Sequence, residues 1–169
     1  MKKLSIAFAL ILTFSVSKAQ EIKVGPGVDI ITPMSKGLKK VSGAGFGLSV
    51  RGQIGFVDKF SIMGTLGYQG FSKVEETRVS MIPAQFGFKY ALMDAELAKL
   101  YISLEAGIHS VRMNTNGNIN NSSSFSYAPG FGVQIQNIDL SVKLQLMDKF
   151  QTSIHTNYFN IRLGYTFGL

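Results

Sequence analysis

The C-terminal stretch Phe159-Asn160-Ile161-Arg162-Leu163-Gly164-Tyr165-Thr166-Phe167-Gly168-Leu169 decides the fold. Apolar side chains at every odd position alternate with small or polar side chains at every even position. A strict period of two is typical of a β-strand, because successive side chains point to opposite faces of the sheet. The stretch therefore predicts a strand with one apolar face and one face of small and polar residues.

The same alternation recurs in seven earlier segments. We expect these strands near residues 22–31, 45–56, 60–69, 79–90, 100–112, 125–136 and 140–147. Together with the C-terminal stretch they make eight strands, an even number, as single-chain bacterial membrane barrels have.

The composition of the second face separates two kinds of β-protein. A soluble sandwich would expose a face rich in Lys, Glu, Asp and Thr, whereas this face consists mainly of Gly, Ser and Gln, as in a narrow lumen. Aromatic residues on the apolar face lie toward strand ends, which is typical of interfacial girdles: Phe46, Phe56, Phe60, Tyr68, Tyr90, Phe125, Tyr127, Phe159 and Phe167. We predict an all-β, closed antiparallel transmembrane β-barrel, an eight-stranded up-and-down meander. A soluble sandwich or a lipocalin-like barrel is the alternative.

The connections alternate in length, as expected for short periplasmic turns and longer outer loops. With both termini periplasmic, the turns are 57–59, 91–99 and 137–139, and the outer loops are 32–43, 71–78, 113–124 and 148–157. The turn at 91–99 is too long, so it holds a helical turn or a strand boundary is misplaced. The loop 113–124 is rich in Asn and Ser and is predicted to be mobile.

The first residues resemble an export signal. Lys2 and Lys3 precede an apolar run, and Ser17 and Ala19 stand before Gln20, so we expect a secretory signal peptide at 1–19 and one barrel domain at 20–169. An uncleaved anchor is the alternative. Without Lys2, Lys3 and Lys18 the net charge falls from +7 to +4. The scattered cations do not form a nucleic-acid footprint but suit outer-membrane lipid and lipopolysaccharide. Cysteine is absent, so disulfides do not stabilise the fold.

Two motifs resemble known barrel proteins. The alternating end Tyr165, Phe167 and Leu169 resembles the signal that outer-membrane proteins present to the barrel-assembly machinery, although the usual last residue is aromatic. The segment 82–90 and the Ala19-Gln20 site resemble small outer-membrane β-barrel domain proteins of the OmpX/OmpA-like superfamily, Bacteroidetes type. The resemblance implies an integral protein of a Gram-negative outer membrane, and it implies place and fold more than activity.

Charged residues on the small, polar face are predicted to point into the lumen. They are Lys23, Asp29, Arg51, Lys89, Glu105, Lys143 and Arg162. An eight-stranded barrel is just wide enough for its own side chains, and an isolated buried charge costs several kcal/mol. We therefore expect a network that fills the lumen, with Glu105 and Asp29 each ringed by Arg and Lys. An ion or proton path is the functional alternative.

Candidate catalytic and metal groups are sparse. His109 with Ser110, or His155 with Ser153, could imitate the Ser and His of lipid A-modifying barrels, but nothing in the sequence supplies the third group of a triad. Glu75 and Glu76 are adjacent loop carboxylates, which are usually only solvated. We therefore expect no catalytic, cofactor or metal site. Three functions remain: a non-enzymatic barrel acting as a structural component or accessory subunit of an envelope complex, a stand-alone surface adhesion protein, or a lipid A-modifying enzyme.

Overall fold

The computed structural model describes residues 21–57, 59–74, 76–95, 97–147 and 156–169. The predicted signal peptide, Glu75, Ser153 and His155 lie outside this part of the chain. Within it, no helix is long and apolar enough to cross a membrane.

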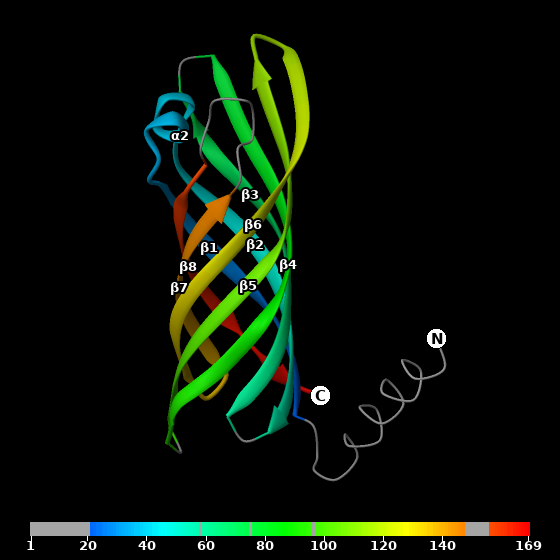
Figure 1. The fold of residues 1–169 in the computed structure, drawn as a ribbon, viewed down its shortest axis with the longest axis vertical. Coiled ribbons are helices and arrows are strands. Elements are labelled where there is room, and N and C mark those ends of the chain that lie inside the picture. Colours follow the sequence, from blue (N-terminus) through cyan, green and yellow to red (C-terminus); the bar gives the residue numbers. More distant parts are fainter. Residues whose placement is uncertain (1–20, 58, 75, 96, 148–155) are drawn as a thin grey trace, which may run out of the picture.

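The chain forms a closed antiparallel meander (Figure 1). Its strands are β1 (Ile22–Pro33), β2 (Ser42–Val57), β3 (Phe60–Lys73), β4 (Thr77–Asp94), β5 (Ala98–Thr115), β6 (Asn118–Ile135), β7 (Ile138–Met147), β8 (Tyr158–Tyr165) and β9 (Phe167–Gly168). From β1 to β8 each strand pairs with the next along the chain, and β1 closes the barrel by pairing with both β2 and β8. β9 continues β8 along β1 after a break at Thr166. The predicted eight-stranded closed barrel is therefore confirmed.

The alternation of side chains follows the sequence pattern. Apolar residues of the first face are exposed on the outside of the barrel, among them Phe46 and Leu48, each 68% exposed. Most Ser, Gln and charged residues of the other face are buried in the lumen. Because β1 pairs with β8, the wall has no open sheet edge, as hydrocarbon requires of a spanning sheet.

Two predicted turns are shorter in the structure. β4 continues to Asp94 and β5 begins at Ala98, so the turn predicted at 91–99 was too long because strand boundaries were misplaced, and its described residues are not helical. The turn predicted at 137–139 ends earlier, because β7 begins at Ile138 and Asp139 pairs with Gln134 and Gly164. This second correction moves a carboxylate from a turn into the lumen wall.

The loop predicted at 113–124 is instead the end of a long hairpin. β5 and β6 stay paired up to Thr115 and Asn118, around a two-residue turn at Asn116 and Gly117. Both turn residues have positive φ, 53° and 85°, the conformation that Asn-Gly adopts in hairpin turns. The Asn114 side chain accepts a hydrogen bond from the Gly117 amide at 3.1 Å. The Asn-Gly pair was therefore the local signal that the composition of the loop obscured.

A short helix, α2 (Lys36–Val41), lies between β1 and β2 at the end of the barrel opposite the C-terminus (Figure 1). Ser35 caps its N-terminus by accepting a hydrogen bond from the Leu38 amide. Leu38 is buried in an apolar cluster with Ile31, Phe71, Met81 and other residues. We call the end with α2 and the β5–β6 hairpin the loop end. Near it the lumen is filled by apolar side chains, and the charges lie deeper.

Candidate functional site

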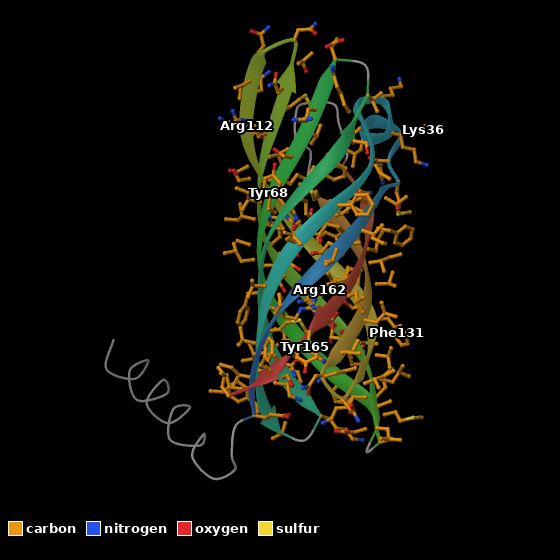
Figure 2. All side chains as sticks on the ribbon, turned by 180° about the vertical axis from the view of Figure 1, so that it is seen from behind. Lys36, Tyr68, Arg112, Phe131, Arg162 and Tyr165 are labelled. Carbon is orange, nitrogen blue, oxygen red and sulfur yellow. The ribbon has the colours of Figure 1, made fainter. Side chains whose placement is uncertain are left out.

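The candidate site is the charge network in the lumen. Arg162 lies in the lower half of the barrel, nearer the C-terminus than the loop end (Figure 2). Arg51, Lys89, Glu105, Lys143 and Arg162 are all buried, and they come from five different strands, β2, β4, β5, β7 and β8. Of the seven charged residues predicted to face the lumen, these five share one network.

Glu105 is held by two cations, as predicted. Its Oε1 atom accepts from the Arg51 guanidinium at 3.4 Å, and Lys143 lies 3.2 Å away. Glu105 and Lys143 approach across the lumen, since β5 and β7 are not adjacent strands. This contact therefore braces the barrel from the inside.

The centre of the network is Asp139, which the sequence analysis placed in a turn. Its carboxylate accepts from the Arg51 guanidinium at 3.0 Å and from the Tyr101 hydroxyl at 2.8 Å. Lys89 lies 3.4 Å and Arg162 lies 3.5 Å from the same carboxylate. Four side chains from four strands converge on this one group. Asp139 lies in β7 two residues before Ser141 and four before Lys143. Extending the alternation of that strand back by one step would have placed Asp139 on the lumen face.

Tyr101 is a second member of the network, which charge alone did not predict. Its ring is fully buried, and the Lys89 ammonium lies 3.8 Å from the ring centroid. Lys89 also donates to Gln134 at 2.8 Å and to Gln53 at 3.3 Å. An aromatic residue on the small, polar face of a strand was the available signal, because that face points into the lumen.

Two of the residues predicted for the network, Asp29 and Lys23, form no ion pair with its other members in the described part of the chain. The expectation that Asp29 is ringed by Arg and Lys is wrong, because no ion pair reaches it within the described residues and its Oδ2 atom has no hydrogen-bond partner. Arg162, its cross-strand neighbour, is oriented toward Ser49, Gly25 and Asp139 instead. Lys23 pairs with Glu21 at 2.7 Å, near the end of the barrel where β1 begins.

A separate uncharged chain of hydrogen bonds surrounds His109. Ser126 Oγ accepts from Gln145 at 2.8 Å and contacts His109 Nδ1 at 2.9 Å. His109 Nε2 contacts the Tyr158 hydroxyl at 3.0 Å, and Tyr158 donates to Gln69 at 2.8 Å. Since Tyr158 gives its proton to Gln69, the consistent arrangement has Nε2–H donating to Tyr158 and Ser126 donating to Nδ1.

The geometry around His109 lacks the parts of a catalytic triad. Ser110, the neighbour considered in sequence, is exposed on the outside of the wall while His109 is buried. Both ring nitrogens contact hydroxyl groups, and within the described residues no carboxylate orients the ring. Nucleophilic catalysis needs such an orienting group and access for substrate. Among the described residues there is also no group of three or more His, Asp or Glu that could hold a metal ion.

The three residues predicted to form the assembly signal all point outward. Tyr165, Phe167 and Leu169 are exposed, and the Tyr165 and Phe167 rings lie 4.8 Å apart. Between them, the Thr166 amide donates to the Asn137 carbonyl at 2.7 Å, which anchors the chain end to the β6–β7 turn. Their recognition by assembly machinery stays a prediction.

The comparisons with known proteins agree with this architecture. Neisserial surface protein A matches with a TM-score of 0.71 and 13% identity, over 88% of this chain and 97% of that chain. The attachment invasion locus protein of Yersinia pestis matches with a TM-score of 0.56 and 18% identity, over 88% and 97%. The N-terminal barrel domain of Pseudomonas aeruginosa OprF also has a TM-score of 0.56, at 10% identity over 88% and 99%. At these identities the matches show the shared fold.

No curated protein sequence matches the chain. The family model described as outer membrane protein beta-barrel domain matches residues 6–167, nearly the whole chain. That match, together with a closed barrel whose exposed wall is apolar, identifies the chain as a member of the outer membrane protein beta-barrel domain family and as an integral outer-membrane protein.

Proposed function

We propose that this barrel is a non-enzymatic protein that acts through contacts made by its outer surface, as a structural component or accessory subunit of an envelope complex. The observation that carries the proposal is the filled lumen. Arg51, Lys89 and Arg162 converge there on Asp139, and Leu38 and its apolar neighbours fill the loop end. A barrel closed in this way offers partners only its wall, its loops and its turns.

The proposal includes an orientation. The turns and the C-terminus lie at one end, and α2 with the β5–β6 hairpin lies at the other (Figure 1). Barrels of this class have short turns on the periplasmic side and longer outer loops. We therefore place the termini in the periplasm and the loop end outside the cell, in a Gram-negative envelope.

The first test is co-purification from native outer membranes. Affinity-tagged protein is cross-linked in intact cells, extracted in mild detergent and analysed by mass spectrometry. The proposal expects a partner in fixed stoichiometry, recovered equally from a variant altered only in the lumen, such as Tyr101→Phe. A cross-linked sample that contains only monomeric barrel would refute the subunit role.

The filled lumen has its own test in planar bilayers. The wild-type barrel is expected to show no single-channel conductance, whereas a pore would conduct in steps that scale with salt concentration. The lipid A phenotype of a deletion strain tests the enzymatic alternative, because a lost modification would show as a mass change in extracted lipid A.

A second role, attachment to a surface, is favoured by the loop end. The β5–β6 hairpin extends above the rest of the barrel in Figure 1, and α2 exposes Lys36, Lys39 and Lys40. The structurally similar Yersinia pestis protein is named for attachment and invasion, and one of its structures contains a heparin analogue. Cell-binding assays with the hairpin shortened between Asn114 and Asn121 test this role. Unchanged cell binding would show that the hairpin is not the attachment surface.

A further inference from the structure

Two arginines face outward side by side near the loop end. Arg78 on β4 and Arg112 on β5 are both exposed, and the register pairs Arg78 with Asn114 and Arg112 with Ser80. They are therefore diagonal cross-strand neighbours, with Cα atoms about 7–8 Å apart. Neither forms an ion pair with another residue in the described part of the chain. The wall thus carries two exposed arginines side by side on neighbouring strands, neither with an ion pair in the described part of the chain.

These arginines lie at the upper border of the apolar band. Toward the other end of the barrel, the next outward residues on the two strands are Ser80 and Ser110, followed by Ile82 and Ile108. Arg112 lies above Tyr68 along the same edge of the barrel in Figure 2. A change from arginine through serine to isoleucine marks the passage from headgroups to hydrocarbon. The arginines are therefore at the depth of lipid phosphates.

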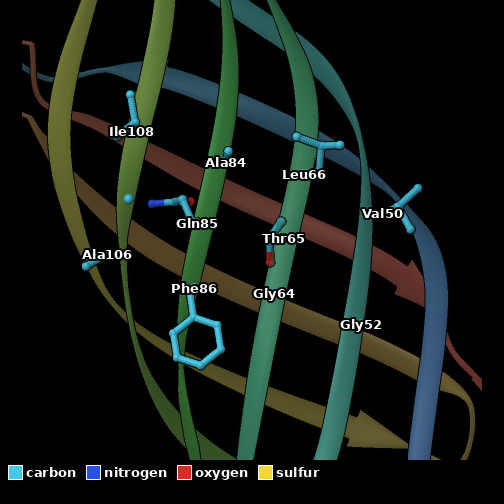
Figure 3. A pocket seen from close by; sticks show the side chains of 11 residues that line it. Val50, Gly52, Gly64, Thr65, Leu66, Ala84, Gln85, Phe86, Ala106 and Ile108 are labelled. Carbon is cyan, nitrogen blue, oxygen red and sulfur yellow. The ribbon is translucent and has the colours of Figure 1, made fainter.

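A groove lies deeper on the same wall. It has a volume of about 630 Å³ and is lined almost entirely by apolar atoms from β2, β3, β4 and β5 (Figure 3). Its floor is formed by small outward residues, Gly52, Gly64, Ala84 and Ala106, and larger side chains surround it, namely Val50, Leu66, Phe86 and Ile108. Gly52 and Gly64 are direct cross-strand partners, so the wall has no side chains at this pair.

The distance between the two features matches one lipid leaflet. Ala84 is six residues along β4 from Arg78, and Ala106 is six residues along β5 from Arg112. Six residues of strand span roughly 20 Å, which at a tilt of about 45° is roughly 14 Å of depth. Half of a hydrocarbon core is about 15 Å. A chain that starts at the arginines therefore ends in the groove.

We propose that the outer wall of β2–β5 binds one phosphorylated lipid of the leaflet at the loop end. Its phosphate is held by Arg78 and Arg112, since paired guanidinium groups match phosphate oxygens with parallel hydrogen bonds. One acyl chain follows β4 and β5 past Ile82 and lies on Gly52 and Gly64. The proposal requires only that the barrel lies in the outer membrane, and it holds whether or not the barrel belongs to a complex.

The test counts bound lipid by native mass spectrometry. Protein in mild detergent is titrated with lipid A, a bis-phosphorylated diglucosamine lipid with several acyl chains. The wild type is expected to retain one lipid. Arg78→Gln with Arg112→Gln is expected to weaken retention at least tenfold. The matched control is Lys39→Gln with Lys40→Gln, which removes the same charge at the same end and is expected to leave retention unchanged.

A second pair of variants tests the groove. A Cβ at Gly64 would have only the Gln85 carbonyl at 3.9 Å nearby, so a side chain can start there, and Gly64→Leu is expected to occupy the groove and weaken lipid retention. Gly168→Leu in β9, at the opposite end of the barrel, is the control, because no atom lies within 4 Å of the added Cβ and the position is away from both the groove and the arginines. A heat-dependent shift in SDS gels verifies that every variant is folded.

Three results would overturn the proposal. Equal lipid retention by all variants means that the lipid belongs to the ordinary annulus around the barrel and has no specific site. Loss of lipid retention in the lysine variant and not in the arginine variant means that the lipid binds a diffuse set of cations at the loop end. Free sucrose octasulfate would then bind the same cations. Dimers in the spectrum that disappear in Gly64→Leu while lipid retention persists mean that a second copy covers the groove.

Discussion

At the scale of single residues, the barrel depends on one carboxylate. Asp139 accepts from Arg51 and Tyr101 and lies within ion-pair distance of Lys89 and Arg162. Buried ion pairs gain little over a well-packed apolar core, but removing one partner leaves uncompensated charge. The four residues around Asp139 are therefore more sensitive to its loss than an exposed pair would be.

We expect Asp139→Asn to lower the free energy of unfolding by about 3–5 kcal/mol. The measurement is urea unfolding of the barrel refolded into lipid vesicles. Asp94→Asn is the control, because Asp94 pairs with Lys99 at 3.0 Å in a partly exposed position and its loss costs about 1 kcal/mol or less. Equal midpoints for the two variants would show that the network does not stabilise the barrel.

A second residue-scale prediction concerns the space beside Tyr101. A Cβ at Gly132 would collide with the Tyr101 ring and lie 2.8 Å from the Leu140 carbonyl. Gly132→Ala is therefore expected to displace Tyr101 from Asp139 and cost about 1–3 kcal/mol, as overpacking does. Gly64→Ala faces open space and is expected to be neutral or stabilising. The same vesicle unfolding assay measures both variants.

At the scale of elements, the β5–β6 hairpin differs from the rest of the wall. Both strands extend well beyond the roughly 9–11 residues that cross a bilayer. Its outer part, from about Arg112 to Asn121, is polar and stays ordered through backbone pairing and the Asn116-Gly117 turn. The hairpin is thus a paired two-stranded projection whose turn depends on a positive-φ glycine.

We expect Gly117→Val to loosen the hairpin tip without opening the barrel. Valine at φ 85° is strained by about 1–3 kcal/mol, and only the local turn can relieve that strain. Limited proteolysis from outside cells measures it, as faster cleavage between Asn114 and Asn121. Gly70→Val, in an extended strand with open space, is the control. Equal cleavage rates would mean that the tip tolerates the substitution.

At the scale of the whole molecule, closure depends on the seam where β1 meets β8 and β9. The seam joins residues near the two ends of the described chain, such as Val24 with Phe167 and Asp29 with Arg162. A Cβ at Gly25 would collide with the Tyr165 carbonyl. The seam therefore closes only if the backbones approach without a side chain between them.

The wild-type barrel is expected to migrate differently in SDS gels before and after boiling, because a closed hydrogen-bonded wall resists the detergent until it is heated. Gly25→Val is expected to abolish this difference by blocking the seam. Gly52→Val, which has no atom within 4 Å of the added Cβ, keeps the difference. A wild-type sample without any heat shift would contradict the closed barrel.

The period of two along each strand was sufficient to predict the barrel, its two faces and most of the lumen charges. This follows because successive side chains of a strand point to opposite faces, so the sequence determines which side chains share a face. The local sequence also indicates the turn at Asn116-Gly117, because Asn-Gly is typical of hairpin turns. The surrounding Asn and Ser residues nevertheless favoured a loop. Element ends were less certain. Alternation is interrupted by a register shift between Ala91 and Met93, and it fades near residues 113–124, where both faces become polar.

What alternation along one strand could not provide was the pairing across the lumen. Arg51, Tyr101, Glu105 and Asp139 lie far apart in the chain, and their contacts depend on the register and curvature of the closed wall. The same is true of the outer face, where Arg78 meets Arg112 and Gly52 meets Gly64 only through cross-strand pairing. The sequence by itself determined which side of the wall each residue occupies, through the fixed geometry of the strand. Only the tertiary structure decided which residues meet, because closing the barrel sets the distances between strands.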